Sequence, residues 1–380
     1  MSFFYNFLKK PSKKKFLIVN ESGSEVLLRE KIIDINNSYI INFKSKNYFN
    51  LWIIVYGLIY NYKLFKKSKY AWIIASLSYF VEPKYTITFM DYIFHFYYVK
   101  KYYPNSKYIS IQVGRRNNEP GQFFDNLRKL SYKKEFFCDY ILAYSKFHAI
   151  EYSKYIKCVS LNTGSIRSNS LKIKTNEQAL DSILFISQFR SNFPKKRAVM
   201  IYDGYKVEHE QFFNAEIYVL KKILKFCQNK NLKLRILSSL KSLENEAINF
   251  YDNLIGRDNY EFINKLSNDQ SYDIVDNHKF VCGIDSTLLY EALARKSRVG
   301  VFYTRKCFIE PLKNIKFGWP AKLNKNGLFW THDIKEEEIY RVLNNLIYLS
   351  DNDWFLKTND VISSVMHYDE NNTIIKNLIK

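Results

Sequence analysis

One segment of the 380-residue chain combines reactive side chains with a clear order of predicted elements. Residues 283–294 read Gly-Ile-Asp-Ser-Thr-Leu-Leu-Tyr-Glu-Ala-Leu-Ala and follow an apolar run that predicts a buried strand. Ser286 and Thr287 would begin a helix, where free backbone N–H groups and the positive end of the helix dipole attract phosphate. Glu291 lies one turn after Thr287 on the same face, where its carboxylate could accept hydrogen bonds from ribose. The alternative is that Asp285 or Ser286 merely caps the helix, and the two uses are compatible.

Side chains beside two further predicted strand ends could complete a nucleotide site. Ser187, Gln188 and Arg190 stand at the end of a strand predicted at 183–187, where an arginine could neutralise phosphate charge. His278 precedes the strand at 280–282 and could contact the base or the sugar, although a lone histidine is also a common structural residue. The predicted nucleotide-sugar-binding residues are Ser187, Gln188, Arg190, His278, Asp285, Ser286, Thr287 and Glu291.

Three residues in the N-terminal half are candidates for the chemical step. Asp91 ends a strand-like run at 86–90, among apolar and aromatic neighbours that raise a carboxyl pKa and suit a base or nucleophile. Arg115 could stabilise the departing phosphate charge, and Glu119 in the same loop could be a second acid or base. We therefore predict Asp91, Arg115 and Glu119 as catalytic residues. The alternatives are a helix N-cap for Asp91 and a solvated basic turn for the arginine.

Two glycine-containing turns of the same half could contact an acceptor. Gln112, Gly114 and Arg116 follow a strand predicted at 107–113, where glycine allows close backbone approach and arginine can grip a carboxylate or phosphate. Gly164 and Ser165 lie just past another predicted strand end. An ordinary turn is the alternative at both places.

No motif in the chain indicates a bound metal or cofactor. The patterns GxxxxGK[ST], HExxH, GxSxG and GxGxxG are absent. Residues 351–353 read Asp-Asn-Asp, which matches a D-x-D metal motif, but they lie between two predicted helices where aspartate commonly caps. We therefore expect no metal and no cofactor.

The alternation of predicted strands and helices favours two α/β units with mostly parallel sheets. Strands of the first unit are predicted at 14–20, 38–43, 70–79, 85–89, 107–113, 140–144 and 159–161. We place the first domain at 1–165, a linker at 166–180, the second domain at 181–350 and a helical segment at 351–380. The predicted fold class is α/β, with two Rossmann-like lobes facing a central cleft and ligands beyond the carboxyl ends of the strands.

The net charge of +21 is concentrated in the first part of the chain. Residues 1–170 hold 27 Lys and Arg against 11 Asp and Glu, a net of +16, and the remainder has a net of +5. Lysines beside aromatics at 47–70 and in the N-terminal KKPSKKK could lie on an anionic bilayer, with an ordinary core helix as the alternative. No nucleic-acid-binding module is found. Five widely spaced cysteines without CxxC fit a reducing cytoplasm.

The motif at 283–294 resembles the C-terminal signature of bacterial surface-carbohydrate biosynthesis proteins, which are glycosyltransferases of the two-lobed GT-B type. The resemblance extends over 86–305, through TITFMD at 86–91, ISIQVGRR at 109–116, CDYILAYS at 138–145, NTGS at 162–165 and ILFISQFR at 183–190. It implies a GT-B-like fold, phosphate contacts from Ser286 and Thr287, and a ribose contact from Glu291. The chain departs from the family's E-x7-E pattern, because Val299 stands eight residues after Glu291. A further resemblance to CMP-Kdo-type transferases implies a CMP-linked donor rather than a UDP- or GDP-linked one.

These observations predict a metal-independent glycosyltransferase that moves a sugar from a nucleotide-activated donor to a surface-glycan acceptor of lipopolysaccharide or capsule. The expected partners are a nucleotide sugar and an anionic lipid-linked glycan, at the cytoplasmic face of the inner membrane, with no nucleic acid. One alternative is a CDP-glycerol-type glycerophosphotransferase, which would need a histidine base in the first lobe, with His95 and His148 as candidates. Another is a non-catalytic carbohydrate-assembly scaffold or nucleic-acid-binding protein.

Overall fold

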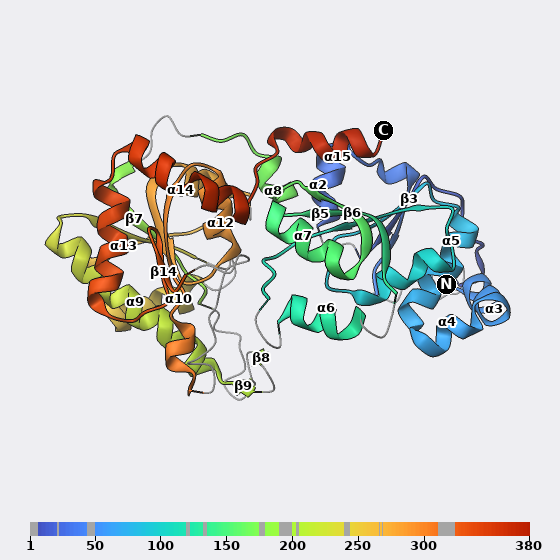
Figure 1. The fold of residues 1–380 in the computed structure, drawn as a ribbon, viewed down its shortest axis with the longest axis horizontal. Helices are drawn as coiled ribbons and strands as arrows, with labels where there is room; N and C mark the ends of the chain where they lie inside the picture. The colour runs from blue at the N-terminus through green and yellow to red at the C-terminus, as the bar shows by residue number, and fades with distance from the viewer. Residues whose placement is uncertain are drawn as a thin grey trace. The chain divides into compact units, whose positions relative to one another are not determined.

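The chain divides into two compact α/β units in a computed structural model (Figure 1). The first unit comprises residues 1–115, 126–170 and 369–380, and the second comprises 116–125 and 171–368. The structure describes residues 7–20, 23–43, 50–118, 122–131, 135–174, 179–189, 200–202, 205–238, 244–265, 267, 269–310 and 324–380.

The first unit is built on a parallel six-stranded sheet in the order β2-β1-β3-β4-β5-β6. Its strands are β1 Phe16–Val19, β2 Ser38–Ile41, β3 Tyr85–Thr88, β4 Lys107–Ile111, β5 Phe137–Ala143 and β6 Lys157–Asn162. β1 and β3 are buried along their whole length, so they read as continuous apolar runs rather than alternating ones. The chain moves outward from β1 to β2 and then returns to the other side of β1 with β3, which makes the β1/β3 boundary a topological switch point.

Helices of the first unit cover this sheet and carry its N-terminal basic region. They are α2 Ser24–Arg29, α3 Leu51–Tyr60, α4 Tyr62–Lys67, α5 Lys69–Val81, α6 Phe123–Ser131, α7 Lys146–Tyr155 and α8 Ile166–Asn169, with the 3-10 helices η1 Ile35–Asn37 and η2 Phe94–Lys101. Helix α6 begins within the segment assigned to the second unit. The strand predicted at 70–79 is wrong, because these residues form α5. Ser68 caps α5 by accepting a hydrogen bond from the Ala71 N–H at 3.1 Å, and most of the helix is buried, which hides its period.

The C-terminus belongs to the first unit, although the chain leaves that unit near residue 170. Helix α15 comprises Thr373–Leu378. Ile375 of this helix and Ile379, which follows it, pack into the core that contains Val26, Leu27 and Ile166. Figure 1 shows α15 beside α2 and α8. The predicted linker at 166–180 contains α8 and the beginning of β7, so part of it is regular structure.

The second unit has a seven-stranded sheet in the order β11-β10-β7-β12-β13-β15-β14, parallel except for the β14–β15 pair. Its strands are β7 Ala179–Ile186, β10 Lys233–Leu237, β11 Glu261–Ile263, β12 His278–Gly283, β13 Arg298–Phe302, β14 Asn326–Gly327 and β15 Trp330–Thr331, and a separate antiparallel pair is β8 Met200–Tyr202 with β9 Tyr205–Val207. From β7 the chain moves outward to β10 and β11 and then returns to pair β12 with β7. The β7/β12 boundary is therefore the switch point of this unit.

Helices of the second unit alternate with its strands, as the sequence predicts. They are α9 His209–Asn229, α10 Glu244–Ile255, α11 Gln270–Asp276, α12 Thr287–Ala294, α13 Glu336–Tyr348 and α14 Asp351–Val365, with the 3-10 helices η4 Arg257–Asn259 and η5 Arg305–Phe308. A further 3-10 helix, η7 Glu370–Asn372, belongs to the first unit. No helix of the described part of the chain is long and apolar enough to cross a bilayer. The predicted α/β class with two parallel-sheet units is confirmed.

Candidate functional site

The switch point of the second unit collects most of the residues that the sequence singles out for phosphate binding. Ser187 and Gln188 follow β7, and the Asp285-Ser286-Thr287 segment follows β12, its neighbour in the sheet. Parallel strands end at the same sheet edge, so both segments lie in the region where open α/β sheets bind ligands. An added Cβ on Gly283 would lie 3.1 Å from the Ile186 carbonyl oxygen, which shows how closely the two strand ends approach.

Helix α12 begins as the sequence predicts. Ser286 is the N-cap residue, with its side chain accepting a hydrogen bond from the Leu288 N–H at 3.4 Å. Ser286 and Thr287 are half-buried, so their hydroxyls remain reachable from the sheet edge. The capping use of Ser286 is therefore present, and it leaves the helix start open to an anion as well.

Arg305 connects the two sides of this switch point. Arg305 is the first residue of η5, with two residues between it and the end of β13, and its exposed fraction is 4%. Its Nε and Nη2 atoms each lie 3.1 Å from a different oxygen of the buried Asp285 carboxylate, and Nη2 also donates to the Gln188 side-chain oxygen. This bidentate pair holds the Arg305 guanidinium beside the start of α12, with its charge balanced by the Asp285 carboxylate.

A buried carboxylate from α9 holds the turn after β7. Glu216 is 1% exposed, and one of its oxygens accepts from the Tyr251 hydroxyl at 2.8 Å and from the Ser187 hydroxyl at 3.2 Å. The other accepts from the Gln188 N–H at 3.1 Å. Burial raises the pKa of Glu216, against the opposing field of Arg305 and the hydrogen bonds. Ser187 and Gln188 thus lie at the switch point, where hydrogen bonds to the Glu216 carboxylate fix their positions.

Two predicted nucleotide contacts lie elsewhere. His278 begins β12, at the amino end of the strand, about 17 Å from Gly283 at a rise of about 3.3 Å per residue. Its Nδ1 lies 2.6 Å from the Ile274 carbonyl oxygen, and burial lowers its pKa. His278 therefore lies at the end of β12 opposite to Ser286 and Thr287, and its contact with the nucleotide stays a prediction. Glu291 is 6% exposed and accepts from the Tyr272 hydroxyl at 3.0 Å, so it joins α12 to α11 instead of facing an open site.

Asp91 in the first unit is fully buried, with 0% of its surface exposed. Its Oδ2 accepts from the Tyr152 hydroxyl at 2.6 Å, and its Oδ1 accepts from the Val113 N–H at 3.2 Å. The Tyr97 hydroxyl also donates to its backbone carbonyl at 2.8 Å. A base or nucleophile must touch the substrate, and in this structure Asp91 is enclosed, so its part in the chemical step stays a prediction. The carboxylate holds the turn after β4 against α7.

The predicted acceptor residues lie at the carboxyl ends of β4 and β6. Gln112 donates to the Gly114 carbonyl at 2.8 Å and accepts from the Tyr144 N–H at 2.9 Å, which joins the ends of β4 and β5. Gly164 has a φ of 70°, which favours glycine, and Ser165 caps α8. Gln112 and Ser165 are thus engaged in holding these turns.

The two arginines of this region are half-buried, and one of them has an aromatic partner. The Arg116 guanidinium lies 4.9 Å from the centre of the Phe123 ring, a cation–π geometry. Arg115 lies in the turn between β4 and α6. Glu119 and Arg190 lie outside the described residues.

A cavity of about 750 Å³ lies at the switch point of the first unit. Its lining comes from Asn20 after β1, from Met90 and residues 92–95 after β3, and from Glu25, Asn42, Phe43 and Tyr70. Aromatic rings and amide or carboxylate groups dominate, and no Lys or Arg occurs among the described residues that line it. His95 is the titratable imidazole in this lining, and its ring lies 5.6 Å from that of Tyr70.

Asp351 of the Asp-Asn-Asp triplet is engaged in ion pairs. It lies 2.9 Å from the Lys279 ammonium and 2.5 Å from the Arg298 guanidinium, and these cations lower its pKa. Asp353 accepts from the Ser350 hydroxyl at 2.6 Å in the cap of α14. No group of three potential metal-ligating side chains occurs within the described ranges.

The sequence did not predict the buried Glu216 carboxylate or the cavity of the first unit. It also did not predict that Arg305 would contact both Asp285 and Gln188. A signal for Glu216 was present, because the buried residues Phe213, Val219 and Leu220 place it on the apolar face of α9. For the cavity there was none, because Asn20, Tyr70 and His95 come together only through the strand order.

Comparisons with known proteins agree with this architecture. A family model described as "putative O-antigen biosynthesis protein" matches residues 109–380. The structure of a putative UDP-N-acetylglucosamine 2-epimerase from Listeria monocytogenes superposes with a TM-score of 0.52 at 10% identity, over 97% of this chain and 95% of that one. S. aureus MnaA with UDP gives 0.50 at 13% identity, over 97% and 96%. The H548A form of the wall teichoic acid polymerase TagF gives 0.48 at 11% identity, over 97% and 89%. No curated protein sequence matches.

At these identities the superpositions establish the fold alone, which is GT-B-like. The family model is the more specific finding, since it spans well over half of the chain and contains β12, α12 and the residues of the second-unit switch point. The chain therefore belongs to the family of O-antigen biosynthesis proteins.

Proposed function

We propose that the protein is a glycosyltransferase that transfers a sugar from a nucleotide-activated donor to a surface-glycan acceptor. The donor binds at the β7/β12 switch point of the second unit, and the acceptor binds at the carboxyl edge of the first. The sugar transfer takes place at the cytoplasmic face of the inner membrane, and the acceptor is an anionic, lipid-linked glycan. A CMP-linked donor remains our expectation over UDP- and GDP-linked donors.

The observation that carries this proposal is the position of Arg305. Cleavage of a nucleotide sugar leaves negative charge on the departing phosphate, and groups aimed at that charge lower the barrier most effectively. The start of α12 offers free N–H groups and the Ser286 and Thr287 hydroxyls, and Arg305 lies beside it with its guanidinium oriented by Asp285. These groups of the chain would meet the charge without a metal, and Arg115 would add to them.

The first-unit cavity suits an uncharged sugar. Aromatic rings such as Tyr70 and Tyr92 can stack on the apolar face of a sugar ring, and Asn20 and Asn42 can bond its hydroxyls. With no cation in its described lining, this cavity favours the terminal sugar of the acceptor over its anionic lipid-linked portion. Gln112, Gly114, Arg116, Gly164 and Ser165 would border the same sheet edge.

For the proton transfer we propose His95 in place of Asp91. The His95 imidazole lines the cavity where the acceptor hydroxyl would lie, and histidine is the side chain used most often for general acid–base catalysis. Asp91 then acts as a positioning residue, through the turn that carries Val113 and the helix that carries Tyr152.

Calorimetric titration with CMP, UDP, GDP and CDP-glycerol tests the donor site. We expect one nucleotide to bind and the Ser286→Ala/Thr287→Ala protein to bind it about 10-fold or more weakly, since hydrogen bonds to charged groups contribute about 1.5–3 kcal/mol. Ser350→Ala is the matched control, because Ser350 caps α14 in the same way and lies outside the site. Equal nucleotide affinity in all three proteins contradicts the site. If none of these nucleotides binds, and the protein instead binds DNA or RNA in a salt-sensitive way, the non-catalytic alternative is favoured.

A glycerophosphotransferase using CDP-glycerol is the second candidate, and the position of His95 favours it. This reaction was expected to need a first-lobe histidine. His148 is 1% exposed and its Nδ1 lies 2.8 Å from the Ser145 hydroxyl, whereas His95 lines the cavity. Binding of CDP-glycerol but not of CMP-sugars would select this candidate.

A further inference from the structure

Helix α3 exposes an almost entirely apolar surface. Its sequence, LWIIVYGLIY, contains no charged residue. Ile53 and Gly57 are buried, and Gly57 packs so tightly on Trp72 that an added Cβ would lie 2.4 Å from the ring. The opposite side forms what we call the α3 face, made of Leu51, Trp52, Val55, Leu58, Ile59 and Tyr60. Their exposed fractions run from 39% for Leu51 to 69% for Tyr60.

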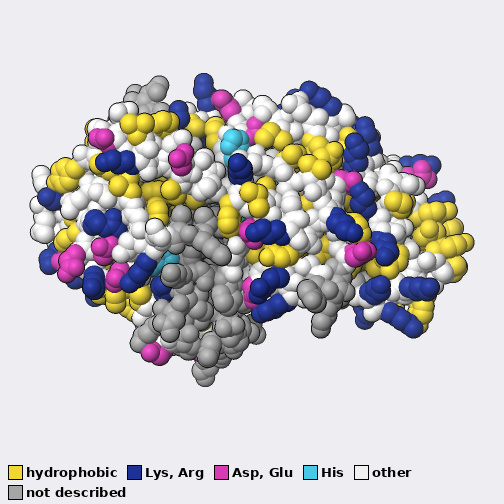
Figure 2. All heavy atoms as spheres, viewed as in Figure 1, with side chains coloured by type: hydrophobic (Ala, Val, Ile, Leu, Met, Phe, Trp, Pro, Cys, Tyr) yellow, Lys and Arg dark blue, Asp and Glu magenta, His cyan; other side chains and the backbone are white. Residues whose placement is uncertain are grey.

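This exposure is concentrated rather than scattered. Single exposed apolar side chains are ordinary on soluble proteins, whereas contiguous patches mark interaction sites. Of the 19 large hydrophobic side chains exposed in the described part of the chain, seven lie within 51–62, namely the α3 face and Tyr62. Figure 2 shows the hydrophobic side chains gathered at the edge of the molecule where Figure 1 places α3.

Lysines surround the α3 face. Lys63, Lys66 and Lys67 of α4 and Lys69 of α5 are exposed, and residues 50–81 contain no Asp or Glu. Figure 2 shows Lys and Arg side chains beside the hydrophobic edge. An apolar helix face bordered by lysines is the pattern of helices that lie in the headgroup region of an anionic bilayer.

The N-terminal basic segment is attached to the same helix. The Asn50 side chain donates to the Lys9 carbonyl at 2.8 Å, and the Trp52 indole N–H donates to the Leu8 carbonyl at 2.8 Å. The Lys10 ammonium consequently lies 5.9 Å from the centre of the Trp52 ring. Charge and apolar surface are therefore held together by specific contacts.

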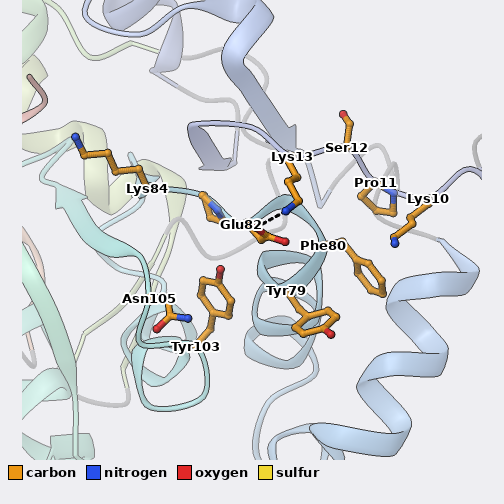
Figure 3. Close-up of a pocket in the computed structure, with 11 residues that line it drawn as sticks. Lys10, Pro11, Ser12, Lys13, Tyr79, Phe80, Glu82, Lys84, Tyr103 and Asn105 are labelled. Carbon is orange, nitrogen blue, oxygen red and sulfur yellow. Dashed lines mark hydrogen bonds and ion pairs between the residues drawn. The ribbon is translucent and has the colours of Figure 1, made fainter.

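A basic cavity of about 820 Å³ adjoins this region (Figure 3). Lys10, Lys13 and Lys84 line it with Tyr79, Phe80 and Tyr103. The carboxylate in this lining, Glu82, is paired with Lys13 at 2.7 Å, so the described lining keeps a net positive charge. A cavity of this size and charge can receive the phosphate of a lipid headgroup beside an inserted helix.

We propose that the α3 face and these lysines form a docking surface for an anionic lipid bilayer. The helix would lie in the membrane plane, since ten residues span only about 15 Å. A protein partner is less consistent with this surface, because lysine is depleted from the cores of protein interfaces. This inference deepens the proposed function, since it would bring the acceptor-binding unit to the membrane that carries a lipid-linked acceptor.

Co-sedimentation of the full chain with vesicles tests the docking surface. We expect binding to phosphatidylcholine vesicles containing about one phosphatidylglycerol in three, little binding to pure phosphatidylcholine, and weakening by salt. Val55→Ser/Ile59→Ser should reduce the binding by about 10-fold or more, because apolar area drives insertion. The matched control is Phe355→Ser/Leu356→Ser, an equally exposed apolar pair on α14 of the second unit, which should leave vesicle binding unchanged.

Several outcomes would overturn the proposal. Unchanged vesicle binding by the α3 variant is one, and equal loss in the α14 control is another. A third is an oligomer, seen by sedimentation velocity, that the α3 variant dissociates, since the face would then be a protein interface. The α3 variant should bind nucleotide with the same affinity as the unmodified protein. A result against the docking surface can therefore be distinguished from a result against the donor site.

Discussion

The two units differ in strand order, but each has a switch point beside its first strand, and different side chains line the two switch points. In the second unit the β7/β12 boundary carries a helix start, hydroxyls and a buried arginine held by a carboxylate. In the first unit the β1/β3 boundary carries aromatic rings, amides, an imidazole and the Glu25 carboxylate, with no Lys or Arg in its described lining. The topology therefore indicates where ligands would bind in each unit, and under the proposed function the side chains at each boundary would favour phosphate in the second unit and an uncharged sugar in the first.

The comparison also separates net charge from site charge. The first 170 residues carry most of the positive charge of the chain, yet the cavity of that unit is lined without it. One group of this unit's lysines instead lies on α4, at the start of α5 and in the N-terminal segment. Basic composition is thus better explained by an anionic surface that the unit touches than by an anionic group inside the cavity.

The largest expected effect is on the chemistry of the first-unit cavity. We expect His95→Ala to lower kcat by about 100-fold or more, as is typical for loss of a general base, with nucleotide affinity unchanged. Asp91→Asn should have a smaller effect, through the turn at Val113, and raise KM for the acceptor more than it lowers kcat. Steady-state kinetics with the transferred sugar as readout checks both. The reverse order of effects would restore Asp91 as the catalytic carboxylate.

An intermediate effect is expected at the arginine of the second unit. Arg305→Met leaves Asp285 buried without its partner and should cost about 3–5 kcal/mol of unfolding free energy. Adding Asp285→Asn should restore much of that stability but not nucleotide binding, which we expect to fall by about 10-fold or more. Urea unfolding and calorimetry measure the two quantities separately.

The chain supplies a matched control for that pair. Arg295 and Asp276 form another fully buried bidentate pair, 2.5 Å apart, on α12 and α11. Arg295→Met/Asp276→Asn removes equivalent interactions away from the helix start, and it should leave nucleotide affinity unchanged. Equal loss of nucleotide binding in both double variants would show that packing, and not the Arg305 charge, matters.

The smallest expected effect is a pH dependence from Glu216. Burial raises its folded pKa above its unfolded value, so its contribution to stability is present at low pH and is lost as pH rises through the folded pKa. Glu216→Gln cannot titrate, and the difference in unfolding free energy between it and the unmodified protein should shift in favour of the variant as pH rises from about 4. Denaturant unfolding across pH checks this, with the exposed Glu246→Gln as a control that should show no such trend.

Local patterns were enough to predict most of the strands and helices and the beginning of α12. The Gly283 to Ala294 segment has a strand end, a capping serine and an apolar helix in sequence order, and the structure has the same order. Residues 70–79 could not be predicted this way, because a segment buried on nearly all sides shows neither helical nor strand periodicity. The sequence places His278 before its strand and Ser286 after it, and the strand direction puts these two residues at opposite edges of the sheet.

The sequence by itself determined the α/β class, the basic first half and the helix start at Ser286, since each depends on composition or on neighbours along the chain. Tertiary structure decided which strands are adjacent. That order brings Arg305 to Asp285 and Gln188, buries Asp91 under Tyr152, and gathers Asn20, Tyr70 and His95 around one cavity. These contacts join residues far apart in the chain, and their geometry follows from strand order and packing, which no local pattern encodes.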